Sequence, residues 1–349
     1  RGFFYVMNTP LVSVVMPVRN SASTLPEAVA SLRQQDLKEI EIILVDHGSS
    51  DSTAELIHSL RVEDRRIRSL RSDGTFVEAI NEGCRRARAD LIARMDGDDV
   101  AHPNRLSKQL QLLQSNHKLD ACGTRGRIRY RGHDSKKISP PEGGYQRYET
   151  WINSLVNEAE IMRERFVDSP VPNPTTMIRR SVFESLNGFS DPSWAEDYDF
   201  WLRFMEQGVR IAKVPEVLLD WYDSPDRSTR NLPRYELDQF QLAKAFYLSR
   251  VPRVRKNGVI IWGAGPIGKQ MARFLAKQEI RTQLFVEVDP KKIGNRIFDC
   301  KVISPADLDK KVRDPVLLAA DGVAGAREEI RGHVLGLEKV EGEDFFCVA

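Results

Sequence analysis

The chain has 349 residues, of which 41% are hydrophobic and 29% are charged, and its formal net charge is +2. This composition is that of an ordinary globular protein, long enough for two or three domains. The nearly balanced charge lacks the basic excess of a general polyanion binder, so we expect no nucleic-acid partner. Because no apolar run approaches the roughly 20 residues needed to cross a bilayer, we also expect no transmembrane segment.

The four cysteines are far apart in the sequence and include no C-x-x-C pair. This spacing argues against a structural zinc site and against a disulfide framework. It favours a reducing compartment, and we therefore expect a cytoplasmic location. The cysteines are Cys84, Cys122, Cys300 and Cys347.

The first hundred residues alternate short apolar runs with amphipathic segments, which is typical of an α/β fold. Such alternation predicts a parallel sheet with right-handed crossovers, in which ligands bind beyond the carboxyl ends of the strands. The expected strands are 11–17, 41–46, 67–70 and 91–93, and the expected helices are 25–35, 54–60 and 77–87.

Three of these strands are followed by polar side chains, which a parallel sheet would bring to one edge. Three clusters at one edge indicate a site more strongly than any single cluster does. They are Arg19 with Asn20, Asp46 with His47, and Asp96 with Asp98.

The third cluster belongs to the acidic stretch L-I-A-R-M-D-G-D-D, which carries the carboxylates of Asp96, Asp98 and Asp99. Carboxylates at positions i and i+2 of a turn can converge on one hard cation, and oxygen ligands suit Mg²⁺ or Mn²⁺. A metal held by one or two carboxylates keeps open positions, which substrate phosphates can fill. The alternative is a polar turn that caps the next helix, because Asp is common in turns and at caps.

Two later segments are also charged. The alternating arginines of 124–137 suggest an exposed strand or hairpin, for which a solvated basic edge is favoured over a contact with an anionic acceptor. Further on, Glu196, Asp197 and Asp199 precede an apolar helix face, either as caps of that helix or with a general base among them. Further helices are expected at 103–115, 148–166, 180–186 and 232–248.

The last hundred residues restart the α/β pattern after a basic, turn-rich linker. A strand at 259–262 enters a G-x-G-x-x-G turn and a helix, and the next strand ends about 20 residues beyond the turn, where a dinucleotide fold has its ribose-binding acid. A Rossmann-like fold is therefore expected, and both a nucleotide-binding and a docking role stay open. The candidate residues of a nucleotide site are Gly263, Gly265, Gly268 and Asp289.

Four stretches together carry a family resemblance: V-S-V-V-M-P-V-R-N, V-D-H-G-S-S-D, A-R-M-D-G-D-D and W-A-E-D-Y-D-F-W. In this order they resemble family-2 glycosyltransferases of the GT-A fold, over about residues 9–230. The layout with the C-terminal glycine turn is also similar to bacterial relatives of the beta-1,3-N-acetylglucosaminyltransferase-like proteins. The implied domains are a GT-A domain at 1–230, a helical linker at 231–257 and a smaller Rossmann-like α/β domain at 258–349.

The resemblance also implies roles for individual residues. Asp98 would be the metal ligand, Asp96 would lie near the ribose and the metal, and Asp197 would be the catalytic base. The implied cofactor is Mn²⁺ or Mg²⁺. The implied nucleotide-sugar-binding residues are Pro17, Arg19, Asn20, Asp46, His47 and Asp96.

His47 departs from the family pattern, which usually has V-D-D-G, with a second acid that often accepts the uracil N3–H. A neutral imidazole nitrogen can accept the same hydrogen bond, but a protonated imidazole can only donate. A strict preference for uridine is therefore not expected.

The implied function is metal-dependent, inverting transfer of a sugar from a nucleotide donor to a hydroxyl of a glycan, a polysaccharide or another acceptor. Peripheral contact with the inner membrane surface stays open. The alternative of a nucleotidyltransferase would require a glycine-rich loop after the first strand, and 17–22 lacks glycine. An NAD-dependent oxidoreductase would leave both acidic centres unexplained, so NAD is not expected to be required.

Overall fold

The computed structural model describes residues 9–132, 138–225, 228–308 and 314–349. Contacts between residues group the chain into two compact units. Unit 1 comprises the described residues of 1–161, 171–191 and 203–231, and unit 2 comprises those of 162–170, 192–202 and 232–349.

The two units are not two consecutive stretches of the chain. Two short segments, 162–170 and 192–202, group with the C-terminal residues although they lie within the expected GT-A range. The expected linker at 231–257 groups with the same unit. The boundaries of the independently folding domains therefore stay a prediction.

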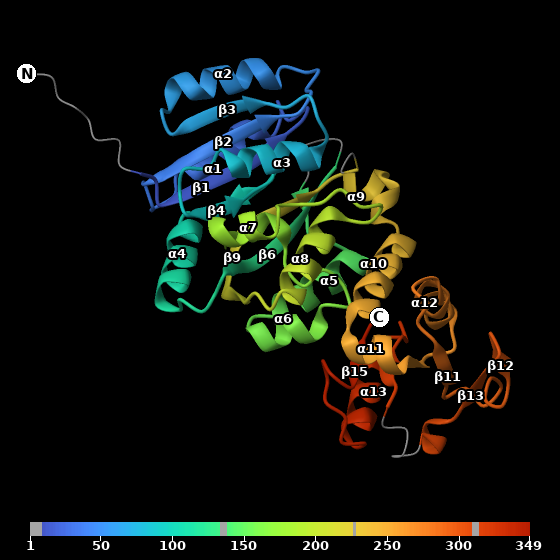
Figure 1. Cartoon of the computed structure of the whole chain (residues 1–349). Helices are drawn as coiled ribbons and strands as arrows, with labels where there is room; N and C mark the ends of the chain where they lie inside the picture. Colours follow the sequence, from blue (N-terminus) through green and yellow to red (C-terminus); the bar gives the residue numbers. More distant parts are fainter. Residues whose placement is uncertain (1–8, 133–137, 226–227, 309–313) are drawn as a thin grey trace, which may run out of the picture. The chain divides into compact units, whose positions relative to one another are not determined.

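Unit 1 contains, within the described residues, a nine-stranded sheet whose strand order differs from the chain order (Figure 1). The first four strands of the sheet are parallel, as the sequence predicts. The other half is mixed, because the fifth strand is antiparallel to both of its neighbours. Across the sheet the strands are β3 (Ile67–Arg71), β2 (Ile40–Asp46), β1 (Val12–Val18), β4 (Leu91–Arg94), β8 (Met177–Arg179), β6 (Ala121–Arg131), β9 (Ile211–Asp223) and β5 (Val100–Ala101), and β7 (Ile138–Ser139) pairs with β6.

Helices connect these strands. The division into units falls within two of them, α6 and α8. The helices are α1 (Leu25–Arg33), α2 (Thr53–Glu63), α3 (Phe76–Arg85), α4 (Arg105–Ser115), α5 (Gly143–Ser154), α6 (Glu158–Glu164), η1 (Asn173–Thr175), α7 (Arg180–Ser185), α8 (Glu196–Glu206) and α9 (Ser228–Asn231).

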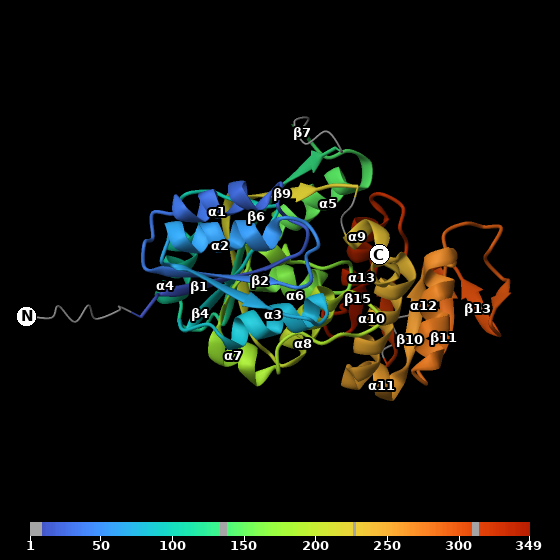
Figure 2. The same ribbon diagram turned by 90° about the horizontal axis from the view of Figure 1, so that it is seen from above.

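Helices cover both faces of the parallel half of the sheet (Figure 2). Val14 and Met16 of β1 belong to one apolar cluster with side chains of α1, α2 and α4. On the opposite face α3 lies so close that a Cβ at Gly83 would be 2.5 Å from Cγ1 of Val15. Because both faces are buried, β1 appears in the sequence as a continuous apolar run.

Strand β6 pairs with β9 along most of its length, and its other edge pairs with β8 at its start and is covered further on by Asn153 and Glu149 of α5, which bond to the backbone of Gly126 and Ile128. The expectation of a solvated basic edge at 124–137 is therefore wrong for the described part of that stretch. Arg127 pairs with Asp220 of β9, and Arg131 pairs with Glu27 of α1. The alternating arginines did mark a strand, but acids far away in the sequence pair with three of them, and Arg125 donates to the backbone carbonyls of Asn153 and Pro215. The end of the stretch lies outside the described residues.

The expected helix at 148–166 is instead divided into α5 and α6. The backbone of Leu155 is extended and ends α5. A carboxylate oxygen of Glu160 then accepts the N–H groups of Val156 (2.8 Å) and Asn157 (3.0 Å). These bonds satisfy donors at the start of α6, as an N-terminal cap does.

In the part of unit 2 that the structure describes, there is a six-stranded sheet in which only the β12–β13 pair is antiparallel. This is the Rossmann-like arrangement that the glycine turn predicts. Its strands are, across the sheet, β12 (Arg296–Ile297), β13 (Cys300–Ile303), β11 (Thr282–Val286), β10 (Val259–Trp262), β14 (Val316–Ala319) and β15 (Phe345–Cys347). Its helices are η2 (Pro233–Tyr235), α10 (Leu237–Arg250), α11 (Pro252–Asn257), α12 (Pro266–Lys277), η3 (Pro305–Asp307) and α13 (Ala326–Leu335).

None of the helices in the described ranges combines the length and the apolar character that crossing a membrane requires.

Candidate active site

The loops that follow β1, β2 and β4 meet at one edge of the sheet of unit 1. β1 lies between β2 and β4 and is parallel to both, so the carboxyl ends of the three strands are adjacent. The backbone N–H of His47 donates to the carbonyl of Val18 (3.1 Å), and Thr24 Oγ1 donates to the carbonyl of Gly97 (2.9 Å). The structure thus brings together the three polar clusters that the sequence placed at this edge.

Asn20 connects the loops after β1 and β2. Its φ of +50° is left-handed, a conformation that Asn tolerates better than most residues. Its side-chain Oδ1 accepts the N–H of Ser50 at 2.8 Å, and its own N–H donates to Ser49 Oγ at 3.0 Å. These bonds fix the shape of the loops, so Asn20 supports the edge structurally whether or not it also contacts a ligand.

The other predicted binding residues of these two loops differ in exposure. Pro17 is buried in β1, opposite Val45 of β2. Asp46 is also buried, and its Oδ1 accepts the N–H of Ser49 at 3.0 Å. Arg19 is exposed. Of the three side chains, that of Arg19 is therefore the one accessible from solvent.

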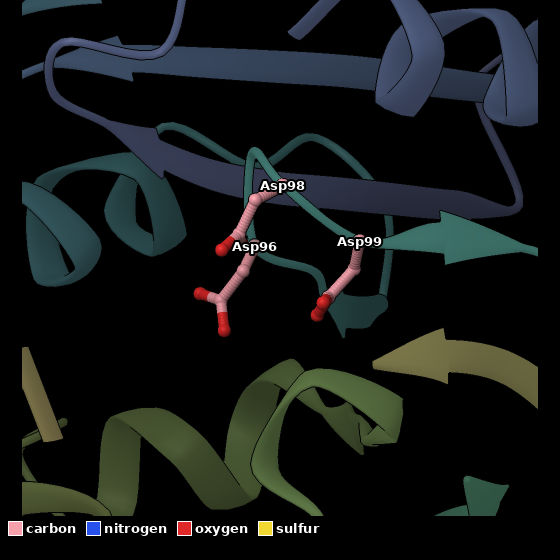
Figure 3. A group of neighbouring side chains, drawn as sticks. All are labelled: Asp96, Asp98 and Asp99. Carbon is pink, nitrogen blue, oxygen red and sulfur yellow. The ribbon is translucent and has the colours of Figure 1, made fainter. Parts of the chain in front are cut away.

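The acidic loop after β4 gathers three carboxylates. One oxygen from each of Asp96, Asp98 and Asp99 lies within 4.8 Å of the others. The three side chains point to the same side of the loop (Figure 3). Asp99 is fully buried, whereas Asp96 and Asp98 are half-buried. A set of carboxylate oxygens at this spacing is suited to a divalent cation.

Two buried arginines support the acidic loop. Arg94 pairs with Asp96 and donates to the carbonyl of Met95. Arg105 donates from Nη2 to the carbonyl of Arg94 at 2.6 Å. Burial lowers the pKa of Arg105 to about 10, and the Asp99 carboxylate opposes this shift. The Arg105 guanidinium remains cationic at neutral pH, and together with the ion pair of Arg94 with Asp96 it offsets part of the repulsion among the carboxylates.

His47 is half-buried, and its ring meets that of Phe76 edge-on with 5.8 Å between centroids. Burial lowers the pKa of His47, Arg19 and Arg94 lower it further, and Asp46 opposes them. The imidazole is therefore neutral at pH 7, with one ring nitrogen able to accept a hydrogen bond.

The second acidic centre lies in unit 2, in the first turn of α8. Asp197 is half-buried, and its Oδ1 accepts the N–H of Tyr198 at 2.7 Å. Its neighbours Glu196 and Asp199 are each only 4% exposed. All three acids are favourably placed at a helix N-terminus. Of the three carboxylates, that of Asp197 is therefore the most accessible from solvent.

The G-x-G-x-x-G turn of unit 2 joins β10 to α12. Gly263 has a φ of +121°, and a Cβ at Gly268 would lie 1.9 Å from the carbonyl oxygen of Gly263. The fold therefore requires these two glycines. A Cβ at Gly265 would have no atom within 4 Å, so packing does not explain why this third position of the turn is a glycine.

The acid that contacts this turn is Glu287, which directly follows β11. Its Oε2 accepts the N–H of Ala264 (3.2 Å) and pairs with the ammonium of Lys292 (3.0 Å). The predicted Asp289 accepts the N–H of Lys291 at 3.0 Å, within its own loop. The sequence E-V-D could have indicated Glu287, because this acid is nearer than Asp289 to the end of β11. A ligand role for Asp289 stays a prediction.

The loops of this edge lie in a part of the chain that matches a known family. Residues 13–186 match the family described as "Glycosyl transferase family 2". The "Putative glycosyltransferase EpsE" of Bacillus subtilis is 30% identical over 237 residues, which cover 66% of this chain and 79% of that relative. The chain belongs to glycosyl transferase family 2. This glycosyltransferase is also 28% identical over 218 residues to an uncharacterized glycosyltransferase of Haemophilus influenzae, covering 61% of the chain and 66% of that relative.

The fold of the glycosyltransferase agrees with this membership. The crystal structure of S. aureus TarS 1-349 in complex with UDP-GlcNAc aligns with a TM-score of 0.51 and 17% identity, over 76% of this chain and 71% of that chain. Residues 254–321, in unit 2, match a family described as "CoA binding domain". The expectation of a GT-A fold followed by a smaller Rossmann-like domain is thereby confirmed, as is the expectation of a glycosyltransferase.

Sequence reasoning missed how the acidic loop is supported. It assigned no role to Arg94 or Arg105, and it did not predict that the carboxylate of Asp99 accepts the backbone N–H of Tyr222. The sequence did contain a signal for Arg94, because an arginine inside an apolar strand is rarely buried without an acidic partner. The contribution of Arg105 had no comparable signal, since its contacts depend on how α4 packs.

Proposed function

We propose that this glycosyltransferase moves a sugar from a nucleoside-diphosphate donor to a hydroxyl of a glycan or another acceptor, using a divalent cation and inverting the anomeric centre. The observation that carries the proposal is the cluster of Asp96, Asp98 and Asp99 at the carboxyl edge of the sheet. The loops after β1 and β2 adjoin it there. This edge is where parallel α/β sheets bind nucleotides.

Asp98 and Asp96 are the proposed ligands of Mn²⁺ or Mg²⁺. The donor set consists of oxygen atoms alone, and both residues are half-buried rather than enclosed, so a cation held there would remain accessible to the oxygens of a diphosphate. A cation bound there supplies positive charge against the departing nucleoside diphosphate. Asp99 is the third carboxylate of the cluster, and its burial favours a role in orienting the loop.

The donor is proposed to lie against the loops that follow β1 and β2. The structural neighbour TarS was solved with UDP-GlcNAc, which supports a nucleotide sugar as the donor class. The neutral imidazole of His47 supplies an acceptor for a base N–H. The exposed Arg19 supplies a cation for an anionic group.

Asp197 is proposed as the general base. It would take the proton of an acceptor hydroxyl while the oxygen attacks the anomeric carbon on the face opposite the departing diphosphate. A single displacement of this kind inverts the configuration, so an α-linked donor gives a β-linked product. The support is the family resemblance of W-A-E-D-Y-D-F-W together with the exposure of Asp197 relative to its two neighbours.

The test is a donor screen on the full chain. UDP-, GDP- and dTDP-sugars are incubated with Mn²⁺ or Mg²⁺, and release of the nucleoside diphosphate is measured with and without EDTA. We expect release from at least one donor that stops when the metal is chelated. Release that is unchanged in EDTA would overturn the metal assignment, and no release from any donor would overturn the proposed donor class.

A second candidate function, nucleotide binding by unit 2, is favoured by Gly265. Packing does not require a glycine there, and a glycine allows a ligand to approach the backbone at the start of α12. The match of this region to a CoA-binding family supports the same class of ligand. We expect that NAD is not required for transfer. Titration of the full chain with CoA, NAD and NADP, beside Gly265→Val, tests the binding, and the donor screen run without added NAD tests whether transfer requires it.

A further inference from the structure

The acids on either side of Asp197 are held by side chains from outside α8. Glu196 and Asp199 are each 4% exposed. A carboxylate this deeply buried is costly unless donors satisfy it. The donors come mostly from η2 and α10, the segment that the sequence presented as a linker between domains. All the residues concerned belong to unit 2.

Asp199 has two donors on one oxygen. Its Oδ1 accepts the indole N–H of Trp194 at 3.0 Å and the hydroxyl of Tyr247 at 2.8 Å. Trp194 precedes the helix and Tyr247 lies in α10, so these bonds join α8 to two other segments. Trp194 is itself packed against Phe246, with 5.4 Å between ring centroids.

Glu196 is held by a second set of groups. Both of its carboxylate oxygens lie within 3.1 Å of the Tyr235 hydroxyl, and Arg234 forms an ion pair with it at 3.5 Å. Burial raises the pKa of Tyr235, and the Glu196 carboxylate raises it further, so this phenol remains a donor throughout the working pH range. A donor and a cation together leave Glu196 little freedom to move.

We propose that Tyr247 and Tyr235 are positioning residues of the transfer reaction, which fix the first turn of α8 and thereby the carboxylate of Asp197. The proposal rests on the proposed role of Asp197 as general base. The two held acids stand one residue before and two residues after it, so a rotation or a shift of this turn breaks both contacts. General-base catalysis depends on such placement, because a misplacement of about 1 Å costs up to about 100-fold in rate.

The test compares two Tyr→Phe variants of the full chain with one control variant. Tyr247→Phe and Tyr235→Phe each remove one hydroxyl that contacts an acid of the turn. Ser249→Ala is the control, because the Ser249 hydroxyl lies on α10 and donates within that helix to the carbonyl of Phe246 at 2.7 Å, and not to an acid of the turn. The two test hydroxyls donate to carboxylates, so we expect Tyr247→Phe and Tyr235→Phe to lose more thermal stability than the control, and kcat is measured well below the lowest Tm.

The kinetic readout separates positioning from stability. With the donor found in the screen, we expect kcat to fall about 10-fold in Tyr247→Phe and Tyr235→Phe, with the donor KM within about twofold of the original. The control is expected to keep both parameters within about twofold. Equal losses of kcat in all three variants, or unchanged kcat in the two test variants, would overturn the proposal.

A double-mutant cycle with Asp199→Asn adds a second readout. If Tyr247 acts through Asp199, Tyr247→Phe lowers kcat by less than about twofold in the Asp199→Asn background, because coupled residues are not additive. If the two substitutions instead lower kcat by independent factors that multiply, the result would contradict the proposal that Tyr247 acts through Asp199.

Calorimetry of UDP or GDP with Mn²⁺ measures nucleotide binding independently of transfer. A failure of this inference can then be told apart from a failure of the proposed function. If the original chain transfers sugar and the test variants match the control, the inference alone fails. If the original chain transfers no sugar from any donor, the proposed function fails and the inference falls with it.

Discussion

The carboxylate of Asp99 accepts the backbone N–H of Tyr222 at 2.9 Å, across a separation of 123 residues. Asp99 ends the acidic loop, and Tyr222 lies near the end of β9. This bond ties the loop to a strand from a distant part of the sequence. It explains why one acid of the cluster is fully buried while the other two are half-buried.

The first prediction concerns the different roles of neighbouring acids. Asp99→Ala leaves the buried N–H of Tyr222 without its acceptor, so we expect a loss of about 1–3 kcal/mol in the free energy of unfolding. Asp98→Ala is the control and is expected to change stability by less than about 0.5 kcal/mol. Urea denaturation measures both, and equal stability of the two variants would contradict the anchoring role of Asp99.

The second prediction is that Asp98→Ala abolishes the metal-dependent part of turnover while the protein stays folded. The reason is that Asp98 is a proposed ligand at a strand end and does not belong to the core. Calorimetric titration with Mn²⁺ and UDP should show weaker binding. Full turnover and unchanged Mn²⁺ affinity in this variant would show that the metal is held elsewhere.

The third prediction separates chemistry from binding at Asp197. Asp197→Asn keeps the size of the side chain but removes the base, so kcat should fall by about 10²- to 10⁴-fold while donor affinity stays within a few-fold. Glu196→Gln is a useful comparison, because that acid is buried and held by Tyr235. A collapse of donor affinity in Asp197→Asn would instead assign this residue to binding or capping.

The fourth prediction concerns His47 and pH. Because the pKa of His47 is lowered, its imidazole is neutral above about pH 6.5 and gains a proton only at lower pH. We expect the affinity for UDP with Mn²⁺ to be constant between pH 7 and pH 8 and to weaken below pH 6.

In the matched variant His47→Asn, the amide oxygen accepts a hydrogen bond at every pH, so its difference from the original chain isolates the imidazole. Identical pH profiles for the two proteins would exclude a contact between His47 and the base.

The fifth prediction concerns stability and Lys213. Its ammonium is buried and donates to the carbonyl of Ile152 at 2.6 Å. Burial lowers its pKa to about 7. Between that value and the pKa of about 10.5 in the unfolded chain, the unfolded state binds the extra proton, so stability rises with pH by up to about 1.4 kcal/mol per unit.

The measurement is the free energy of unfolding of the original chain and of Lys213→Met between pH 6 and pH 9. We expect the difference between them to be flat below pH 7 and to grow in favour of the original chain above it. A difference that does not change with pH would show that Lys213 titrates normally.

Much of the fold follows from local patterns in the sequence. The continuous apolar runs of β1, β2 and β4 predicted buried parallel strands, because such runs occur where helices cover both faces of a sheet. The G-x-G-x-x-G turn predicted the start of the Rossmann-like unit for a similar reason, since Gly263 and Gly268 are needed by the backbone itself. The polar residues at three strand ends then predicted a site, because parallel strands end at a common edge.

The contacts that stabilise this site were decided by the tertiary structure alone. Asp99 depends on Tyr222, and Arg127 and Arg131 of β6 pair with Asp220 and Glu27. Asp199 likewise depends on Tyr247 of α10. Sequence periodicity reports which face of an element is apolar, but it contains no information about which distant polar group will meet that face. Pairing between charges far apart in the chain is set by the packing of the elements, and it therefore becomes visible only in three dimensions.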